Sequence, residues 1–290
     1  MIASTTIPVV SRVSDLRVAA DTARSQGKRV GLVPTMGYLH EGHKSLVACS
    51  VAQNDLTVVS VFVNPLQFVE GEDYGAYPRD LERDCRICAE AGAGLVFAPP
   101  TEEVYPQTPV TAVVVRGLNA VLEGRFRPTH FDGVTTVVAK LFAMVGPARA
   151  YFGEKDYQQL AIIRTMAADL SLPMEVVGCP TLREPDGLAM SSRNIYLTTE
   201  QRPAATVLWR SLQAGHEAVK GGSRDPSEVE AAMAEVLAAE AGVSVDYAAV
   251  VDAATLERPE VLAGELRLLV AARLGRARLI DNIGVDCGWL

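Results

Sequence analysis

Short apolar runs alternate with helical patterns over the first part of the chain. Six runs bounded by turn-forming residues predict strands at residues 29–34, 56–63, 94–98, 110–115, 149–152 and 174–178. Apolar residues at helical spacing predict helices between several of them, at roughly 42–53, 78–91, 131–145 and 156–170. This alternation is typical of an α/β fold in which helices cover both faces of a parallel sheet.

The pattern changes from residue 200. Helical patterns at about 200–220 and 226–241 flank the connector GGSRDP, and β-like runs follow at 243–251, 265–273 and 277–285. We therefore predict two domains. Residues 1–180 are expected to form a Rossmann-like, doubly wound parallel sheet, and residues 181–290 a smaller α+β domain.

Composition and charge narrow the class of protein. Of the 290 residues, 49% are hydrophobic and 21% are charged, which suits a globular protein with a sizeable core. The net charge of −8 argues against nonspecific binding to nucleic acid or to an anionic membrane. The N-terminus lacks a signal-peptide pattern, and no apolar run reaches the length of a membrane span. We therefore expect a cytoplasmic protein that binds neither nucleic acid nor membrane.

The five cysteines are scattered along the chain and suggest no disulfide framework. Two of them, Cys85 and Cys88, form a C-x-x-C. With Leu81 they follow the i, i+4, i+7 spacing of one helix face, with Pro78 at the first helical position and Gly92 at the stop. A redox C-x-x-C would sit at a strand-to-helix turn, so this pair is predicted to pack in the core.

Two histidines, His40 and His43, follow the first predicted strand in the segment PTMGYLHEGH. A turn here would point the N-terminus of the next helix at the carboxyl end of a parallel strand, where free N–H groups favour anions. Two imidazoles three residues apart would add donors beside a phosphate. The alternatives are two solvent-facing histidines or, with less support because no second ligand pair is apparent, a zinc site.

Polar side chains also follow the second predicted strand. Asn64 and Gln67 carry amides that suit recognition of hydroxyl and carboxylate groups, although a capped turn at Asn64-Pro65 is an alternative. Further on, Arg125, Arg127 and His130 precede a predicted helix, and a solvated basic loop is the alternative interpretation there.

The segment AYFGEKDYQQL places three candidate residues at the start of a predicted helix. Lys155 suits neutralisation of phosphate charge, and Asp156 suits a helix cap, ribose hydroxyls or a metal. Gln159 lies about one turn further along and is predicted to reach the same cleft. The alternative is a capped helix start with a solvated lysine.

A fourth candidate segment, TLREPDGLAMSSRNIYL, combines a turn at residues 185–187 with Met190, two hydroxyls (Ser191 and Ser192) and Arg193. Small donors beside a guanidinium suit a polyphosphate. A polar hairpin between domains is the alternative. Each of these segments alone is weak evidence for a functional site. Together they are stronger evidence, because they converge on strand-end turns of one predicted sheet.

These segments carry a resemblance to a known family. HEGH, preceded by PTMG, resembles the HxGH signature of the adenylyl-transferring superfamily that includes class I aminoacyl-tRNA synthetases, and MSSR resembles its mobile phosphate-binding loop. The full set is similar to the pantoate–β-alanine ligase (pantothenate synthetase) family: PTMGYLHEGH, VFVNPLQF, YPRDLERD, RPTHFDGV, FGEKDYQQL and REPDGLAMSSRNIYL. The motifs run in order from about residue 33 to residue 197, and SVDYAAVVDAATL and LLVAARLGRARLIDNI continue the match.

The resemblance implies a reaction in two steps. The carboxylate of pantoate attacks the α-phosphate of ATP, which releases pyrophosphate and leaves pantoyl adenylate. The amine of β-alanine then attacks the activated carbonyl and gives pantothenate and AMP. ATP is the expected co-substrate. Mg²⁺ is expected on the ATP phosphates, with no metal site of the protein's own, and the family is generally a homodimer.

The resemblance also implies roles for individual residues. His43 matches the proton donor, and His40, Lys155 and Arg193 complete the expected catalytic set. The expected ATP site comprises Met36, Gly37, Tyr38, Leu39, His40, Glu41, Gly42, His43, Gly153, Glu154, Lys155, Asp156, Leu182, Met190, Ser191, Ser192 and Arg193. Gln67, Gln159 and Asn64 are expected to bind pantoate and β-alanine. Because an acyl adenylate must be kept from water, the second domain and the loop at residues 64–77 are expected to close over the site.

The sequence departs from the usual family pattern at a few positions. Thr129 stands where glycine is common, Leu182 replaces a frequent valine, and Thr198-Thr199 replaces a frequent Ser-Pro. None of these is a proposed catalytic side chain.

Other functions fit less well. A nucleotidylyltransferase with a phosphorylated acceptor would place arginines where Gln67 and Gln159 stand. A non-catalytic nucleotide-binding module would tolerate loss of the two histidines, Lys155 or Arg193, yet all four are present. An RNA-binding role lacks a basic stripe or an appended domain.

Overall fold

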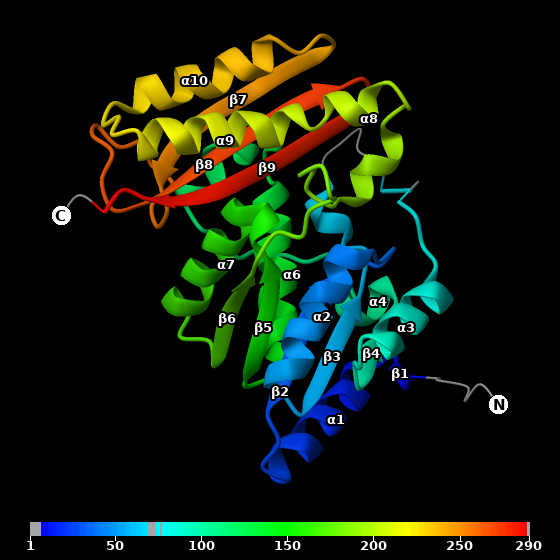
Figure 1. Cartoon of the computed structure of the whole chain (residues 1–290). Coiled ribbons are helices and arrows are strands. Elements are labelled where there is room, and N and C mark those ends of the chain that lie inside the picture. The colour runs from blue at the N-terminus through cyan, green and yellow to red at the C-terminus, as the bar shows by residue number, and fades with distance from the viewer. Residues whose placement is uncertain (1–6, 69–73, 76, 289–290) are drawn as a thin grey trace. The chain divides into compact units, whose positions relative to one another are not determined.

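The computed structural model describes residues 7–68, 74–75 and 77–288. The chain forms two compact units (Figure 1). One consists of Met1–Glu154 and Gln158–Pro180, the other of Lys155–Tyr157 and Thr181–Leu290. The short segment Lys155–Tyr157 therefore belongs to the second unit by its contacts, although both of its chain neighbours belong to the first.

The first unit is built on a six-stranded parallel sheet with the order β1-β4-β3-β2-β5-β6. Its strands are β1 (Val9–Val10), β2 (Val30–Thr35), β3 (Leu56–Val61), β4 (Leu95–Phe97), β5 (Ala148–Gly153) and β6 (Met174–Cys179). From β2 the chain steps outward through β3 to β4, and it then returns to place β5 on the other side of β2. The strand order therefore reverses between β2 and β5, which is the point where open α/β sheets bind ligands.

Helices pack against both faces of this sheet, so its strands alternate between two cores. The longer helices are α1 (Val13–Ser25), α2 (Glu41–Gln53), α3 (Leu81–Glu90), α6 (His130–Val145) and α7 (Tyr157–Asp169). Leu32 and Val58 pack with α1, α6 and α7, whereas their neighbours Val33 and Val59 pack with α2 and α3. This period of two in buried strands confirms the predicted doubly wound parallel sheet.

Short helical turns connect these elements in the first unit. They are η1 (Pro65–Gln67), α4 (Thr101–Val104), η2 (Leu118–Ala120), α5 (Glu123–Phe126) and η3 (Glu154–Asp156), the last of which runs into the second unit.

The second unit is an antiparallel sheet of β7 (Val243–Asp252), β8 (Glu265–Leu274) and β9 (Ala277–Asp286), with β8 in the middle. Its helices are η4 (Ser192–Tyr196), α8 (Gln201–Ala204), α9 (Val207–Lys220) and α10 (Pro226–Ala238). Leu268 and Val270 of β8 share one core with Leu212 of α9 and Met233 of α10. The α9 and α10 helices therefore cover one face of the sheet (Figure 1), and the predicted α+β architecture is confirmed.

Five of the six strands predicted for the first part of the chain are present, and the strand predicted at residues 110–115 is wrong. Val110 is fully exposed. The main chain at Val113 is satisfied by side chains of α6: its N–H donates to Thr136 Oγ1 at 3.0 Å, and its carbonyl accepts from the Thr135 hydroxyl. An apolar run of this length is therefore held by a helix instead of a neighbouring strand.

Two helix predictions need correction. The helix predicted at 78–91, α3, begins at Leu81 and not at Pro78, because the Asp80 carboxylate accepts the N–H of Arg83 at 3.0 Å and caps the helix there. The single helix predicted at 200–220 is two helices, α8 and α9. The Pro203 carbonyl at this break accepts both the N–H and the hydroxyl of Thr206, at 3.2 and 2.7 Å, in place of a continuing helical bond.

Besides short helical turns such as α4 and α5, the strand β1 and the helix α1 were not predicted. The β1 strand has only two residues, and one of them, Val9, is exposed. The α1 helix buries Leu16, Ala20 and Ala23, and two alanines give a weak apolar signal.

The C-x-x-C is a packing feature, as predicted. Cys88 is fully buried in α3, and burial raises the pKa of its thiol to about 12. Burial also raises the pKa of Cys85, so neither sulfur favours the reactive thiolate. Leu81 is an exception to the predicted buried face, because it is exposed. Gly92 ends the helix region with φ +85°, as predicted for a stop.

None of the helices in the described part of the chain has the length and apolarity that a bilayer crossing requires.

Thr129 is exposed and adopts φ +69°, which explains why glycine suits this position before α6. We predict that Thr129→Gly stabilises the protein. Relief of the left-handed backbone gains about 1–2 kcal/mol, and the extra freedom of glycine in the unfolded chain costs about 0.5–1 kcal/mol. Urea unfolding should therefore show a net gain of about 0.5–1 kcal/mol. The matched control, Thr206→Gly at φ −65°, should lose stability. A loss in Thr129→Gly would contradict this interpretation.

Candidate active site

The segment that leaves β2 folds into a tight loop and then begins α2. Gly37 adopts φ +82°, and a Cβ there would lie 2.9 Å from both Asp84 Oδ2 and Val61 Cγ1, so only glycine fits. The Thr35 hydroxyl supports the turn, because it accepts the N–H of Gly37 at 3.2 Å and donates to the carbonyl of Ser60 at 2.7 Å. The loop thus delivers His40 to the first position before α2.

His40 and His43 cap α2 reciprocally. His40 Nδ1 accepts the N–H of Gly42 at 3.1 Å, and His43 Nδ1 accepts the N–H of His40 at 3.3 Å. The two ring centroids lie 4.1 Å apart. Because each Nδ1 is an acceptor, each neutral ring carries its proton on Nε2. Both rings are half-buried, so the interpretation as solvent-facing histidines is not supported, and their Nε2–H groups add to the anion preference of this helix end.

A buried carboxylate that the sequence analysis missed holds this loop in place. Asp84 of α3 is 1% exposed, and its two oxygens accept the N–H groups of Tyr38 and Leu39 at 2.8 and 2.7 Å. The neighbouring Arg83 lies over the Tyr38 ring, 5.0 Å from its centroid. The signal that could have found Asp84 is its position, four residues before the buried Cys88 on the same helix face, where an apolar residue is expected.

The amide of Gln67 is held between two other predicted site residues. Gln67 Nε2 donates to Met36 Sδ at 2.9 Å, and Gln67 Oε1 accepts from Asn64 Nδ2 at 3.2 Å. Asn64 is itself buried and fixed, because its Nδ2 also donates to the Gly133 carbonyl at 3.1 Å and its Oδ1 accepts from the Tyr105 hydroxyl at 2.9 Å. The structure thus brings Met36, Asn64 and Gln67 together.

Asn64 also confirms the predicted capped turn, because Oδ1 accepts the N–H of Leu66 at 3.3 Å and begins η1. The cap and the placement of Gln67 are therefore parts of one arrangement. Burial raises the pKa of Tyr105, which keeps its hydroxyl a donor to Asn64.

The candidate basic segment splits into a buried and an exposed part. His130 is buried, and its Nδ1 lies 2.7 Å from the Gln67 carbonyl while its Nε2 lies 3.0 Å from Arg127 Nη1. An arginine only donates, so Nε2 is the acceptor and Nδ1–H donates to Gln67. His130 therefore holds the main chain of Gln67. Arg125 is exposed, as the solvated-loop interpretation expects.

Adjacent glutamines at the start of α7 occupy different environments. Gln158 is buried: its Oε1 accepts the N–H of Glu123 at 3.0 Å, and its Nε2 donates to the carbonyls of Leu118 and Val121 at 2.7 and 2.8 Å. Gln159 is half-buried, and within the described part of the chain no hydrogen bond engages its side chain. Of the two, Gln159 is the one whose amide is available for a ligand.

The predicted site residues Gly153 and Glu154 lie in the first unit, at the carboxyl end of β5. Gly153 ends β5, where it pairs with Cys179 of β6, and Glu154 follows it. The β5 strand pairs directly with β2, through Gly31 with Arg149 and Leu32 with Ala150. The segment after β5 therefore starts from the strand beside the one that carries the histidine loop.

The second unit holds the other predicted phosphate-binding residues. The Lys155 side chain is 15% exposed, and its Nζ lies 3.6 Å from Asp156 Oδ1. The carbonyl of Lys155 accepts from Asn282 Nδ2 at 2.7 Å. The predicted proximity of Asp156 and Gln159 joins residues of different units and stays a prediction.

The segment after Thr181 forms a hairpin, in agreement with the predicted turn. Arg183 forms an antiparallel bridge with Ala189, and the N–H of Met190 donates to the Leu182 carbonyl at 3.0 Å. Gly187 adopts φ +92°, and a Cβ there would lie 2.1 Å from the Trp209 ring. The hairpin leads directly into the four residues Met190–Arg193.

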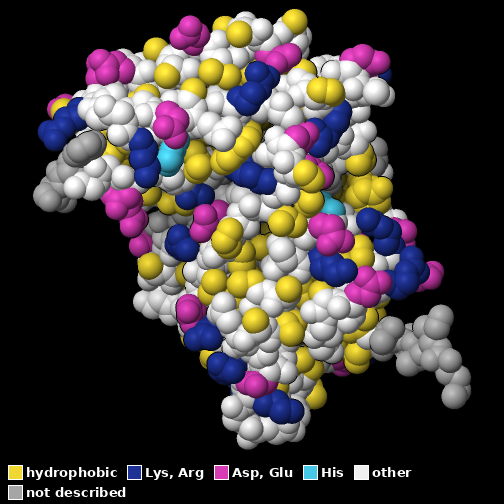
Figure 2. Space-filling model, viewed as in Figure 1, with side chains coloured by type: hydrophobic (Ala, Val, Ile, Leu, Met, Phe, Trp, Pro, Cys, Tyr) yellow, Lys and Arg dark blue, Asp and Glu magenta, His cyan; other side chains and the backbone are white. Residues whose placement is uncertain are grey.

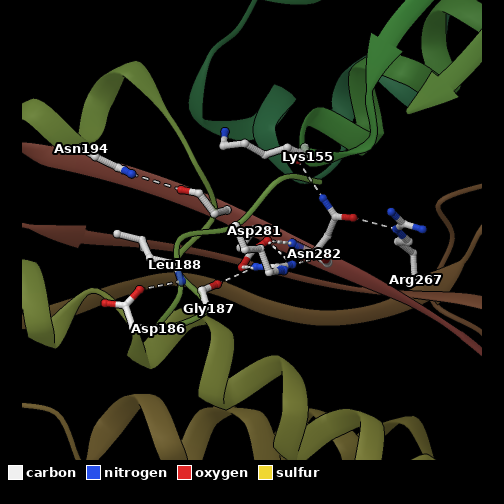
Figure 3. Close-up of polar contacts among 10 residues, drawn as sticks. Lys155, Asp186, Gly187, Leu188, Asn194, Arg267, Asp281 and Asn282 are labelled. Atoms are coloured by element: carbon white, nitrogen blue, oxygen red, sulfur yellow. Dashed lines mark hydrogen bonds and ion pairs between the residues drawn. The ribbon is translucent and has the colours of Figure 1, made fainter. Parts of the chain in front are cut away.

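Local hydrogen bonds hold the loop at residues 190–193 and its flanks, and Figure 3 draws the one from Asn194. Ser191 caps η4, because its Oγ accepts the N–H of Arg193 at 3.3 Å. Asn194 Nδ2 donates to the Ala189 carbonyl at 3.1 Å. Arg193 is exposed. The segment thus forms the predicted polar hairpin, and it leads directly into Ser191, Ser192 and Arg193.

The distribution of charged side chains and of metal-ligating side chains indicates which ligands the protein can bind. On the face drawn in Figure 2, the Lys and Arg side chains are interspersed with Asp and Glu and form no continuous basic stripe. Among the described residues, no group of three or more His, Cys, Asp or Glu side chains is placed to hold a metal ion.

The family model of pantoate–β-alanine ligase matches residues 8–284, nearly the whole chain. The chain belongs to the pantoate–β-alanine ligase family. The resemblance found in the sequence motifs is therefore confirmed, and so is the ligase class of enzyme.

Named relatives of this ligase family cover almost all of the chain. The pantothenate synthetase of Rubrobacter xylanophilus is 54% identical, with 89% of this chain and 92% of the relative covered. The pantothenate synthetase of Aquifex aeolicus is 51% identical, with 93% and 96% covered.

Solved structures of the ligase family share the fold. The pantothenate synthetase of Thermus thermophilus superposes with a TM-score of 0.90 at 51% identity, over 96% of this chain and 99% of that one. The pantoate–β-alanine ligase of Francisella tularensis, a complex with beta-gamma ATP and β-alanine, gives a TM-score of 0.78 at 31% identity, over 96% and 97%. The predicted Rossmann-like fold with a smaller second part is confirmed.

Asp84→Asn tests whether this carboxylate holds the histidine loop. One oxygen becomes an NH₂ group that faces a backbone N–H, so one hydrogen bond to a charged group is lost. We expect the free energy of unfolding to fall by about 2–3 kcal/mol in urea denaturation.

The control for this prediction is Asp80→Asn in the same helix. Asparagine caps helices about as well as aspartate, so this variant should stay within about 0.5 kcal/mol of the parent. Equal stability of the two variants would remove the proposed role of Asp84.

Proposed function

We propose that the protein condenses pantoate with β-alanine to pantothenate, with cleavage of ATP to AMP and pyrophosphate through pantoyl adenylate. The observation that carries the proposal is membership of the pantoate–β-alanine ligase family over residues 8–284. The Francisella relative supports it further, because that protein is described in complex with beta-gamma ATP and β-alanine.

In the first step, a carboxylate oxygen of pantoate attacks the α-phosphorus of ATP. An oxygen–phosphorus bond forms, the bond to the β-phosphate oxygen breaks, and pyrophosphate leaves with its electron pair. The reactants are both anions, so donors and cations must meet the charge that gathers in the transition state. His40 and His43 suit this role, because their Nδ1 atoms are occupied by the helix start and their Nε2–H groups donate.

The remaining charge falls on the transferring and leaving phosphates. We assign Lys155 and Arg193 to its neutralisation, helped by the hydroxyls of Ser191 and Ser192. Gly153, Asp156 and the main chain at Leu182 are assigned to adenosine binding, with Met36 beside the nucleotide. The contact from Gln67 supports this placement of Met36, because it ties the nucleotide-side residue to the pantoate side.

Gln67 and Gln159 are assigned to pantoate, with Asn64 as the residue that orients Gln67. Amides recognise hydroxyl and carboxylate groups without a positive charge that would quench the nucleophile. Gln67 is held on both ends of its amide, by Met36 and by Asn64. A preorganised donor of this kind fixes the attacking carboxylate at low entropic cost.

In the second step, the neutral amine of β-alanine attacks the acyl carbon of pantoyl adenylate. A carbon–nitrogen bond forms, the carbon–oxygen bond to AMP breaks, and the nitrogen gives up one proton. The adenylate is sensitive to hydrolysis, so this step needs a site from which water is excluded.

Mg²⁺ is assigned to the ATP phosphates. This suits the described residues, which present no cluster of three carboxylate or imidazole ligands, and Mg²⁺ is typically bound through substrate phosphates and water. When bound, the ion offsets negative charge on the polyphosphate. The homodimer and the cytoplasmic location also stay predictions.

Closure over the adenylate is a further proposal. We assign nucleotide and pantoate binding to residues 1–180 and closure to residues 181–290. The loop at residues 64–77 that was predicted to close lies partly outside the described residues, at 69–73 and 76.

The reaction is tested by mass spectrometry of mixtures that contain the protein, Mg²⁺, ATP, pantoate and β-alanine, with each organic component omitted in turn. We expect pantothenate and AMP only in the complete mixture, and pantoyl adenylate when β-alanine is omitted. Adenylate without any amide would contradict the assigned acceptor. Absence of both products from folded protein that binds ATP would contradict the proposed function.

His43→Ala should lower the rate of adenylate formation by about 10²–10³, because it removes a donor that acts in the transition state. The measurement is pantoate-dependent exchange of pyrophosphate into ATP. His216→Ala, on α9 beside Glu217, is the matched control and should leave the rate unchanged. A loss of less than about tenfold in His43→Ala would remove this histidine from the chemistry.

Alanine variants of the adjacent glutamines of α7 should distinguish a role in stability from a role in pantoate binding. Gln158→Ala removes three buried hydrogen bonds to the main chain and should lower the free energy of unfolding by about 2–4 kcal/mol. Gln159→Ala should leave stability within about 0.5 kcal/mol and raise the KM for pantoate at least about tenfold. Urea denaturation and steady-state kinetics check the pair. The reverse assignment of effects would contradict the roles given to them.

A further inference from the structure

Two adjacent residues of β9, Asp281 and Asn282, are buried polar residues that the proposed chemistry does not use. Neighbours on a strand point to opposite faces of a sheet, so the two side chains leave β9 in different directions. In the second unit each one reaches a segment that carries a proposed phosphate-binding residue (Figure 3).

Asp281 holds the base of the hairpin through Arg183. Its carboxylate accepts from Arg183 Nη1 at 2.6 Å and from Nη2 at 3.0 Å, a bidentate pair. Arg183 also donates to the carbonyls of Gly187 at 3.0 Å and Asn282 at 3.2 Å, and it lies over the Trp209 ring at 3.9 Å. Burial raises the pKa of Asp281, and the hydrogen bonds from Arg183 oppose that shift. The Arg183 guanidinium therefore contacts four groups, and these contacts fix the base of the hairpin.

The hairpin carries this constraint to the phosphate-binding loop. Arg183 forms the antiparallel β-bridge with Ala189. The next residue, Met190, begins the loop that contains Ser191 and Arg193. The bidentate pair thus fixes the chain immediately before the loop.

Asn282 holds the Lys155 segment. Its Oδ1 accepts from Arg267 Nε at 2.7 Å, and because an arginine only donates, its NH₂ group must be the side that meets the Lys155 carbonyl at 2.7 Å. Arg267 also lies over the ring of Tyr157, 4.0 Å from the centroid, and the Tyr157 hydroxyl donates to the Ala253 carbonyl at 2.9 Å. The three residues from Lys155 to Tyr157 are therefore tied to the sheet at two points.

The two anchors are coupled directly. The N–H of Asn282 donates to Asp281 Oδ1 at 2.8 Å, and both residues are paired with β8, Asp281 opposite Val270 and Asn282 opposite Leu269. Register in the three-stranded sheet therefore sets the spacing of both segments at once.

We propose that Asp281 and Asn282 are positioning residues that hold Lys155 and the loop at residues 190–193 in fixed register, so that both meet the polyphosphate of ATP together. The inference rests on the proposed roles of Lys155 and Arg193. It assigns a function to the RLIDNI segment of β9, which carries no reacting group.

The test is the affinity for Mg²⁺-ATP of the full chain, measured by isothermal titration calorimetry. Asn282→Ala removes the donor to the Lys155 carbonyl and should weaken ATP binding about 10- to 100-fold, because small misplacements of binding groups have effects of this size. Asn282→Asp keeps the acceptor for Arg267 but loses the donor to Lys155, so it serves if the alanine variant does not fold. Asp281→Asn should weaken binding in the same direction.

The matched control is Asp286→Asn at the end of the same strand, where the carboxylate accepts only the N–H of Gly288, at 3.0 Å, in the described structure. It should bind ATP as the parent does. Steady-state kinetics add a second readout: the KM for ATP should rise about tenfold or more while the KM for pantoate changes less than about twofold. A general loss of folded protein would lower kcat without this split.

The outcomes separate the two proposals. ATP affinity within about twofold of the parent in folded Asn282 and Asp281 variants would overturn the positioning role, even if the parent makes pantothenate. Equal rises in the KM values for ATP and pantoate would also overturn it. A parent protein that binds ATP but makes no pantothenate would overturn the proposed function, while the calorimetry would still decide the positioning role.

Discussion

The direct parallel pairing of β2 with β5 is the constraint on which the candidate site in the first unit depends. The chain passes through β3 and β4 on one side of β2 and then returns to the other side, so the strand order reverses between β2 and β5. Segments that leave these two strands therefore start side by side at the carboxyl edge of the sheet. One carries His40 and His43, and the other begins with Gly153 and Glu154. A sheet with β2 and β5 apart would separate the motifs that the family membership joins in one reaction.

The loops at these ends are shaped by buried side chains that hold main-chain atoms. Asp84 accepts two N–H groups of the histidine loop, and His130 donates to the carbonyl of Gln67. In the second unit, Asn282 donates to the carbonyl of Lys155. In each case a buried polar group, costly without a partner, is satisfied by the main chain of a segment that carries candidate site residues. The segments that carry candidate site residues are thus held by residues that lie far away in the sequence.

The sequence predicted what depends on local pattern. Apolar runs in the sequence predicted the buried strands. Turn-forming residues predicted the turn at residues 185–187 and the end of the helix at Gly92. The false strand at 110–115 shows the limit, because only the fold reveals that Thr135 and Thr136 take the main-chain bonds of Val113. The partners of Asp84 and Asn282 could not be predicted for the same reason, since they lie about 45 and 127 residues away. The main motif residues were first recognised as polar side chains at predicted strand-end turns, and the family resemblance then supplied their expected roles.

The most direct test of the adenylation chemistry follows a carboxyl oxygen of the substrate. Pantoate labelled with oxygen-18 in both carboxyl oxygens is turned over with ATP and β-alanine, and the nucleotide product is analysed by mass spectrometry. Attack on the α-phosphate leaves one substrate oxygen on phosphorus, so we predict AMP with one labelled oxygen and pantothenate that keeps the other. Unlabelled AMP, or ADP as the nucleotide product, would contradict attack at the α-phosphate.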